Sequence, residues 1–136
     1  MSPEGAPPNN SAADESNVSG EWLLTNRVDS TDYPAYQGIR LGYILTLRQD
    51  GARISGGGEK TSENGAPTPP GQRSPIAVTG RVDNGTVTLQ FTERGALRAS
   101  TGTFRWQLSP DNARLSGSFA SDAASSRGSS TAQRVH

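Results

Sequence analysis

The residues able to do chemistry are few in this chain, and they form no catalytic set. There is no cysteine, and the only histidine is His136, the last residue. A cysteine or histidine metal site and a histidine general base are therefore excluded, and a serine nucleophile would have no base to activate it. We expect no enzymatic activity, no bound metal and no cofactor.

Two polar side chains stand on the apolar face of predicted strands. Asn26 follows Trp22 and Leu24 in alternation, and Tyr43 stands among alternating leucines. A polar group on an inner face needs a hydrogen-bond partner. A ligand could supply it, but so could water, a backbone carbonyl or the other of these two side chains.

Aromatic residues add to this candidate site. Tyr33 and Tyr36 flank Pro34 and its neighbour on one loop, which could cover a barrel mouth, plug it or touch a partner protein. Trp106 is the large aromatic residue that we place beside them at the mouth. The predicted ligand-binding residues are therefore Asn26, Tyr33, Tyr36, Tyr43 and Trp106.

The stretch Gly56-Gly57-Gly58-Glu59-Lys60 is similar to a phosphate-binding loop in composition alone. It lacks the full spacing of such a loop and the following helix that would aim amides at a phosphate, so a strand or a bulge is the better interpretation. Lys60 and Glu93 lie near predicted strand ends. Solvated charges are the simpler reading, whereas an inward pair would make a selective rim.

Short segments with a period of two position these residues. Eight of them are separated by turn signals such as Asp50-Gly51 and Asn84-Gly85, at residues 20–28, 39–48, 52–60, 75–82, 86–92, 102–108, 115–119 and 126–135. Only the loops at 29–38 and 61–74 are long, so sequential strands should pair as hairpins. The sequence predicts an all-β fold, an eight-stranded antiparallel up-and-down β-barrel, because closure removes exposed edges. A β-sandwich is the alternative.

Composition limits the organisation and the partners. The chain has 136 residues and 13 basic against 13 acidic side chains, which predicts one domain without the basic surface that nucleic acid requires. No apolar run approaches the ~20 residues of a membrane span, so we expect no membrane insertion and assign no compartment. Residues 1–19 are rich in Pro, Asn and acids, which is typical of a disordered linker or tail, and residues 20–136 form the predicted barrel domain.

Gly20 and Trp22, spaced as Gly-x-Trp at the start of the first strand, resemble the calycin superfamily of lipocalins, fatty-acid-binding proteins, avidins and bacterial protease inhibitors. The resemblance implies that Trp22 closes one barrel end and that Arg134, in the last strand, packs across its indole ring. Leu24 stands where an avidin would place a ligand-binding asparagine. The resemblance therefore does not extend to biotin binding.

Whether the barrel interior is open or filled decides the function class. Eighteen large side chains are predicted to point inward and could fill it, whereas inward glycines could leave a void at one end. An open end would make the chain a non-catalytic module that binds a small, largely apolar ligand. A filled barrel would instead serve as a protein-interaction, accessory or inhibitor-type domain of a larger protein.

Overall fold

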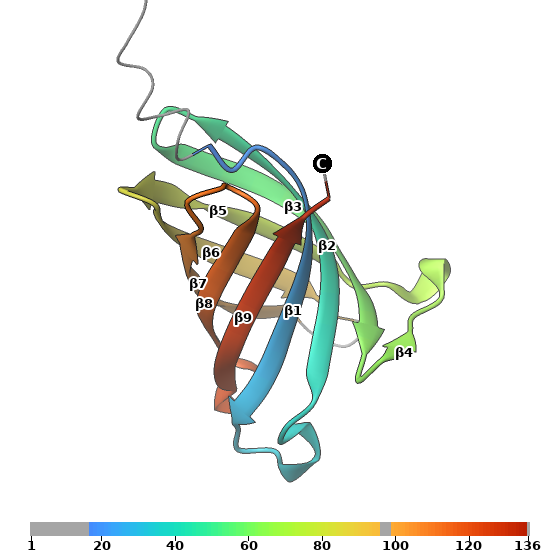
Figure 1. Cartoon of the computed structure of the whole chain (residues 1–136). Helices are drawn as coiled ribbons and strands as arrows, with labels where there is room; N and C mark the ends of the chain where they lie inside the picture. The colour runs from blue at the N-terminus through green and yellow to red at the C-terminus, as the bar shows by residue number, and fades with distance from the viewer. Residues whose placement is uncertain (1–16, 96–98, 136) are drawn as a thin grey trace, which may run out of the picture.

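Eight long antiparallel strands build the fold, as shown by the computed structural model, which describes residues 17–95 and 99–135. The strands are β1 (Gly20–Ser30), β2 (Arg40–Asp50), β3 (Arg53–Glu63), β5 (Pro75–Asp83), β6 (Thr86–Arg94), β7 (Ala99–Leu108), β8 (Arg114–Ser121) and β9 (Arg127–Arg134). A two-residue strand, β4 (Ala66–Pro67), pairs only with the end of β3 (Figure 1).

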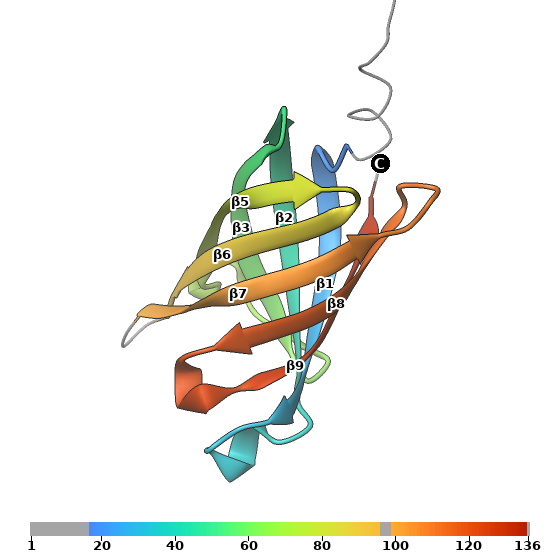
Figure 2. The ribbon, with the colours of Figure 1, turned by 90° about the vertical axis from the view of Figure 1, so that its left-hand side faces the viewer.

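The long strands close into a ring. Each pairs antiparallel with the next long strand, and β1 pairs with both β2 and β9, so no long strand is left with a free edge (Figures 1 and 2). The predicted eight-stranded up-and-down barrel is confirmed, and the alternative of two facing sheets is wrong. Hairpin-length turns explain the order, because antiparallel neighbours need only a few residues to connect.

The two ends of the barrel differ. Tight turns after β2, β5 and β7 gather at the end where β1 begins, which we call the closed end. Asn84 (φ 50°) and Gly85 (φ 80°) make the turn between β5 and β6, where two successive positive φ angles suit the twist of a hairpin. The opposite, open end carries the longer connections 31–39, 64–74 and 122–126.

Each of these longer connections holds one short 3₁₀ helix: η1 (Pro34–Tyr36), η2 (Pro70–Gln72) and η3 (Ala123–Ser125). Among the described residues there is no helix of the length and apolar character that a membrane crossing needs.

One predicted loop begins later than expected. The prediction of a loop over residues 61–74 was wrong for its first three residues, because β3 continues to Glu63. Asn64 (φ 51°) and Gly65 (φ 86°) then turn the chain back into β4. The prolines that suggested an irregular loop begin only at Pro67, and the Asn-Gly pair before them is itself a hairpin signal.

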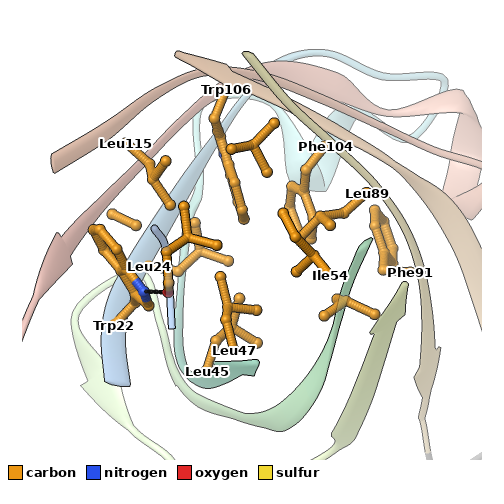
Figure 3. Close-up of a cluster of buried hydrophobic side chains, with 14 of the residues drawn as sticks. Trp22, Leu24, Leu45, Leu47, Ile54, Leu89, Phe91, Phe104, Trp106 and Leu115 are labelled. Carbon is orange, nitrogen blue, oxygen red and sulfur yellow. Dashed lines mark hydrogen bonds between the residues drawn. The ribbon is translucent and has the colours of Figure 1, made fainter. Parts of the chain in front are cut away.

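Apolar side chains fill the interior from the closed end upward. Every large residue predicted to point inward is buried, except Leu41, which is partly buried. The most deeply buried are 0 % exposed, namely Trp22, Leu45, Val87, Leu89, Phe104 and Leu115. A void able to hold water would leave accessible surface on the side chains around it, so this part of the barrel is packed solid. Figure 3 shows the side chains projecting from all around the wall toward the axis.

Glycine lets the wall bend sharply around this core. A Cβ atom on Gly58 would overlap the carbonyl oxygen of Ile44 on β2, and one on Gly56 would overlap that of Thr46. The glycine run in β3 is therefore explained by the close approach of two backbones. This confirms that the run is part of a strand.

Candidate functional site

Four polar side chains meet at the open end, and we call them the mouth cluster: Tyr43, Lys60, Glu93 and the more exposed Glu63, whose side chain is 55 % accessible. The Tyr43 hydroxyl donates to Glu93 Oε1 at 2.7 Å, and Lys60 Nζ lies 3.2 Å from Glu93 Oε2. Glu63 Oε1 lies 3.8 Å from the same ammonium. The side chains of Glu93 and Lys60 are only 14 % and 18 % exposed, so this ion pair is largely withdrawn from water.

A β-bulge creates the cluster. The pairing of β2 with β3 shifts register, because Gly42 faces Ser62 whereas Tyr43 faces Lys60, which leaves Thr61 as the extra residue. In a regular strand, residues three apart point to opposite faces. The extra residue brings Lys60 and Glu63 onto the same inner face, which is how bulges commonly re-aim side chains beside functional sites.

Burial determines the ionisation of Tyr43. Desolvation raises the pKa of the Tyr43 phenol well above its usual value, and the neighbouring Glu93 carboxylate raises it further by charge and by hydrogen bonding. The phenol is therefore a neutral donor that holds the Glu93 carboxylate in place. Retaining an ion pair in such a setting costs free energy of desolvation, which makes the cluster a weak way to stabilise a fold.

Alkaline pH should expose this coupling. Because the folded-state pKa of Tyr43 lies above the unfolded value of about 10, its stabilising contribution is fully present below about pH 10 and is lost as the pH rises through the folded-state pKa. We expect the free energy of unfolding of wild type to fall over this range more steeply than that of Tyr43→Phe. Urea unfolding of both proteins between about pH 8 and about pH 11 measures the difference, and parallel curves would contradict the assignment.

Asn26, on the inner face of β1, has an unmet hydrogen-bonding need. It is 2 % exposed, and its Oδ1 atom has no hydrogen-bond partner among the described residues. Asn26 on β1 pairs with Leu41 on β2, and Tyr43 is the next residue of β2 on the same face. Asn26 and Tyr43 are therefore diagonal neighbours on the inner face. A buried, unbonded carbonyl oxygen costs about 1–3 kcal/mol.

The predicted aromatic residues separate in space. Trp106 is 1 % exposed, stacks on Phe104 with ring centroids 4.8 Å apart and donates from Nε1 to Ser130 Oγ at 2.8 Å. It lies in the filled core and has no surface left for a ligand in this conformation. Tyr33 and Tyr36 lie on the open-end loop, 51 % and 36 % exposed, with their rings edge to face at 4.7 Å.

The structure therefore brings Asn26 and Tyr43 together and adds three residues that were not chosen as ligand-binding candidates, Lys60, Glu63 and Glu93. For Lys60 and Glu93 the sequence allowed either solvated charges or an inward pair at the rim, and the structure shows the inward pair. Glu63 lay in a predicted loop, and only a bulge in β3 points it inward. Periodicity gives no signal for a single inserted residue.

The closed end holds the remaining predicted residues. Gly20 has a φ of 135°, which only glycine adopts readily, and it begins β1 two residues before Trp22. The guanidinium carbon of Arg134 lies 4.4 Å from the centre of the Trp22 ring. Arg134 also donates to the backbone oxygens of Asn17, Ser19 and Asn112 at 2.9, 2.6 and 2.8 Å.

Three residues of the predicted linker lie across this end. Val18 is completely buried, and its carbonyl oxygen accepts a hydrogen bond from Trp22 Nε1 at 2.8 Å. Its amide donates to the Gln49 side chain at 2.8 Å. The other residues of that linker, 1–16, lie outside the described residues, as does His136.

Comparison with protein-family models, with curated proteins and with solved structures gives no match for this chain. Within residues 17–95 and 99–135, His, Cys, Asp and Glu side chains form no group of three placed to hold a metal ion.

Proposed function

We propose that this chain is a non-catalytic barrel module that binds a small, largely apolar molecule at its open end. The observation that carries the proposal is the buried, unbonded Asn26 carbonyl oxygen near the largely buried ion pair of Lys60 and Glu93. Both features cost stability, and both lie in the same part of the inner face. Polar groups that a fold does not need for packing are typical of binding sites.

Packing indicates where such a ligand would lie. The solid core excludes a deep, lipocalin-like chamber along the axis, so the ligand would rest in the mouth against partly buried Ile39 and Leu41. Reaching Asn26 would require the Tyr43 and Glu93 side chains to shift, since Tyr43 is itself only 4 % exposed. Side-chain adjustments of this size are common on binding.

The charges of the mouth cluster favour a particular head group. Two carboxylates, Glu63 and Glu93, against one ammonium, Lys60, make a formal charge of −1. The unbonded Asn26 Oδ1 atom can accept a hydrogen bond from a donor on the ligand. We therefore expect an amine or hydroxyl head group to bind better than a carboxylate.

Asn26→Leu tests this proposal because stability and binding should change in opposite directions. Leucine is similar in size to asparagine and has no unbonded polar group, so the free energy of unfolding should rise by about 1 kcal/mol. Binding should weaken by about tenfold, because the ligand loses its acceptor. Displacement of an environment-sensitive dye by decylamine, decanol and decanoate measures the binding. Thr25→Val, on the exposed face of the same strand, is the matched control. Equal affinity for all three head groups, or no displacement at saturation, would refute the proposal.

A second candidate is supported by the filled core and by the exposed pair Tyr33 and Tyr36. A solid barrel is a rigid support, and tyrosines on a loop are typical anchors of protein interfaces. The chain would then be an interaction, accessory or inhibitor-type domain. Tyr33→Ser with Tyr36→Ser would abolish partner binding and leave dye displacement unchanged.

Membership of the calycin superfamily is part of the proposal. Its support is the eight-stranded ring together with the stacking of Arg134 on Trp22 at the closed end.

A further inference from the structure

A groove of about 1110 Å³ runs over the outer wall of the barrel, away from the mouth. Its floor is the outer face of β2, β3, β5, β6 and β7 near the closed end, and Figure 2 shows the last three of these strands crossing the front of the barrel. Four arginines line it: Arg48, Arg53, Arg81 and Arg105. Two aspartates, Asp50 and Asp83, also line it, so its formal charge is four minus two, or +2.

Register places three of the arginines in one row. Arg53 faces Arg81, Arg81 faces Thr88, and Thr88 faces Arg105 across successive strands. The neighbouring row continues with hydroxyl and amide side chains, since Ser55 faces Thr79 and Thr79 faces Gln90. The groove is thus a strip of guanidinium groups bordered by hydrogen-bonding side chains.

This arrangement has no structural justification within the barrel. Like charges directly opposite each other on neighbouring strands are destabilising, and Arg53 and Arg81 are such a pair. In the part of the chain that the structure describes, none of the four arginine side chains takes part in an ion pair or a hydrogen bond. Arginine forks match carboxylate oxygens two at a time, so the row is suited to an anionic partner.

The lining selects among anionic partners. It contains no aromatic side chain on which a base could stack, which disfavours single-stranded nucleic acid. Both edges of every floor strand are already paired, so a partner cannot add a strand and must be held by side chains. Neighbouring strands lie about 4.8 Å apart, so Arg53 on β3 and Arg105 on β7, three strands away, are separated by about 14 Å. In an extended peptide, side chains on the same face repeat about every 6.7 Å, so the first and the third side chain on that face lie about 13 Å apart. The two spacings match.

We propose that this groove binds an extended acidic protein segment that carries Asp or Glu at alternate positions and runs across the strands. Its outer carboxylates contact Arg53 and Arg105, and Arg81 lies between them. Thr88 and Gln90 supply hydrogen bonds to the backbone of the bound segment. The site is separate from the mouth and does not require a ligand there.

Fluorescence anisotropy of a labelled peptide of alternating serine and glutamate, mixed with the full chain, tests the proposal. We expect saturable binding that Arg81→Gln weakens by at least about tenfold, because a lost charged hydrogen bond is worth a decade or more. Arg127→Gln is the matched control, since it removes the same charge from the exposed face of β9 on the opposite wall. It should change the affinity by less than about twofold.

Thermal unfolding separates binding from folding. Arg81→Gln relieves the repulsion with Arg53, so its melting temperature should equal or exceed that of wild type. A lower melting temperature would mean that Arg81 has a structural role and would overturn the proposal. Equal loss of binding in Arg127→Gln, binding of the matching serine and glutamine peptide, or tighter binding of single-stranded DNA than of the acidic peptide would overturn it as well.

Discussion

Trp22→Ala should lower the free energy of unfolding by about 3–5 kcal/mol, the range for truncating a large buried aromatic side chain. Trp22 is 0 % exposed. Its indole donates a hydrogen bond to the Val18 carbonyl oxygen and packs against the Arg134 guanidinium. The truncation therefore opens a cavity at the closed end and leaves the Val18 carbonyl without its donor. A small domain often has little more stability than this in total.

Urea unfolding followed by circular dichroism measures the loss. Leu23→Ala is the matched control, because Leu23 is next to Trp22 in β1 but is 53 % exposed on the outer face. The control should change stability by less than about 1 kcal/mol. Comparable losses in the two variants would mean that Trp22 does not seal the barrel.

Arg134→Met should lower the free energy of unfolding by about 2–3 kcal/mol. Methionine preserves much of the apolar stem but cannot donate to the backbone oxygens of Asn17, Ser19 and Asn112. These charge-assisted hydrogen bonds join the last strand, the β7–β8 turn and the segment before β1, so their loss loosens three pieces of chain at once. Arg134→Lys should recover only part of this loss, because one ammonium lacks the planar fork that reaches several acceptors.

Chemical unfolding in urea again provides the measurement, with Arg127→Met as the control on the same strand. Arg127 is exposed and should tolerate the change to within about 0.5 kcal/mol. Full recovery of stability by Arg134→Lys would show that charge alone matters and that the three hydrogen bonds of the guanidinium do not.

Much of the fold was predictable because local and global signals agree. Alternation along β2, with Tyr43, Leu45 and Leu47 facing inward, defines a strand without reference to its neighbours. Asn84-Gly85 and similar pairs define the turns. Short turns then leave the meander as the simplest order, and eight strands in that order can close.

The mouth cluster was not predictable to the same degree. Tyr43 on β2 and Glu93 on β6 are 50 residues apart in the sequence, and they meet because the sheet curls from β2 through β3 and β5 to β6. Lys60 and Glu63 share a face because Thr61 is an extra residue in β3, and one inserted residue leaves no mark on composition or periodicity. The arginine row on the outer wall has the same origin, since Arg53, Arg81 and Arg105 are aligned by pairing register alone.

Whether the barrel is open or filled does not follow from the sequence. The sequence identifies which side chains point inward, but not whether they meet across the axis. The absence of accessible surface on Leu45, Leu89 and Phe104 answers this for the closed half. The proposed ligand would therefore lie at the open end, beside the unbonded Asn26 oxygen.

An NMR titration of the ¹⁵N-labelled chain with decylamine tests this central claim most directly, because the Asn26 side-chain amide gives its own signal. We expect that signal to shift saturably together with the backbone amides of Tyr43, Lys60 and Glu93, while those of Val18 and Trp22 at the closed end stay in place. Unchanged Asn26 and Tyr43 signals at saturating decylamine, or shifts confined to the Tyr33 and Tyr36 loop, would contradict it.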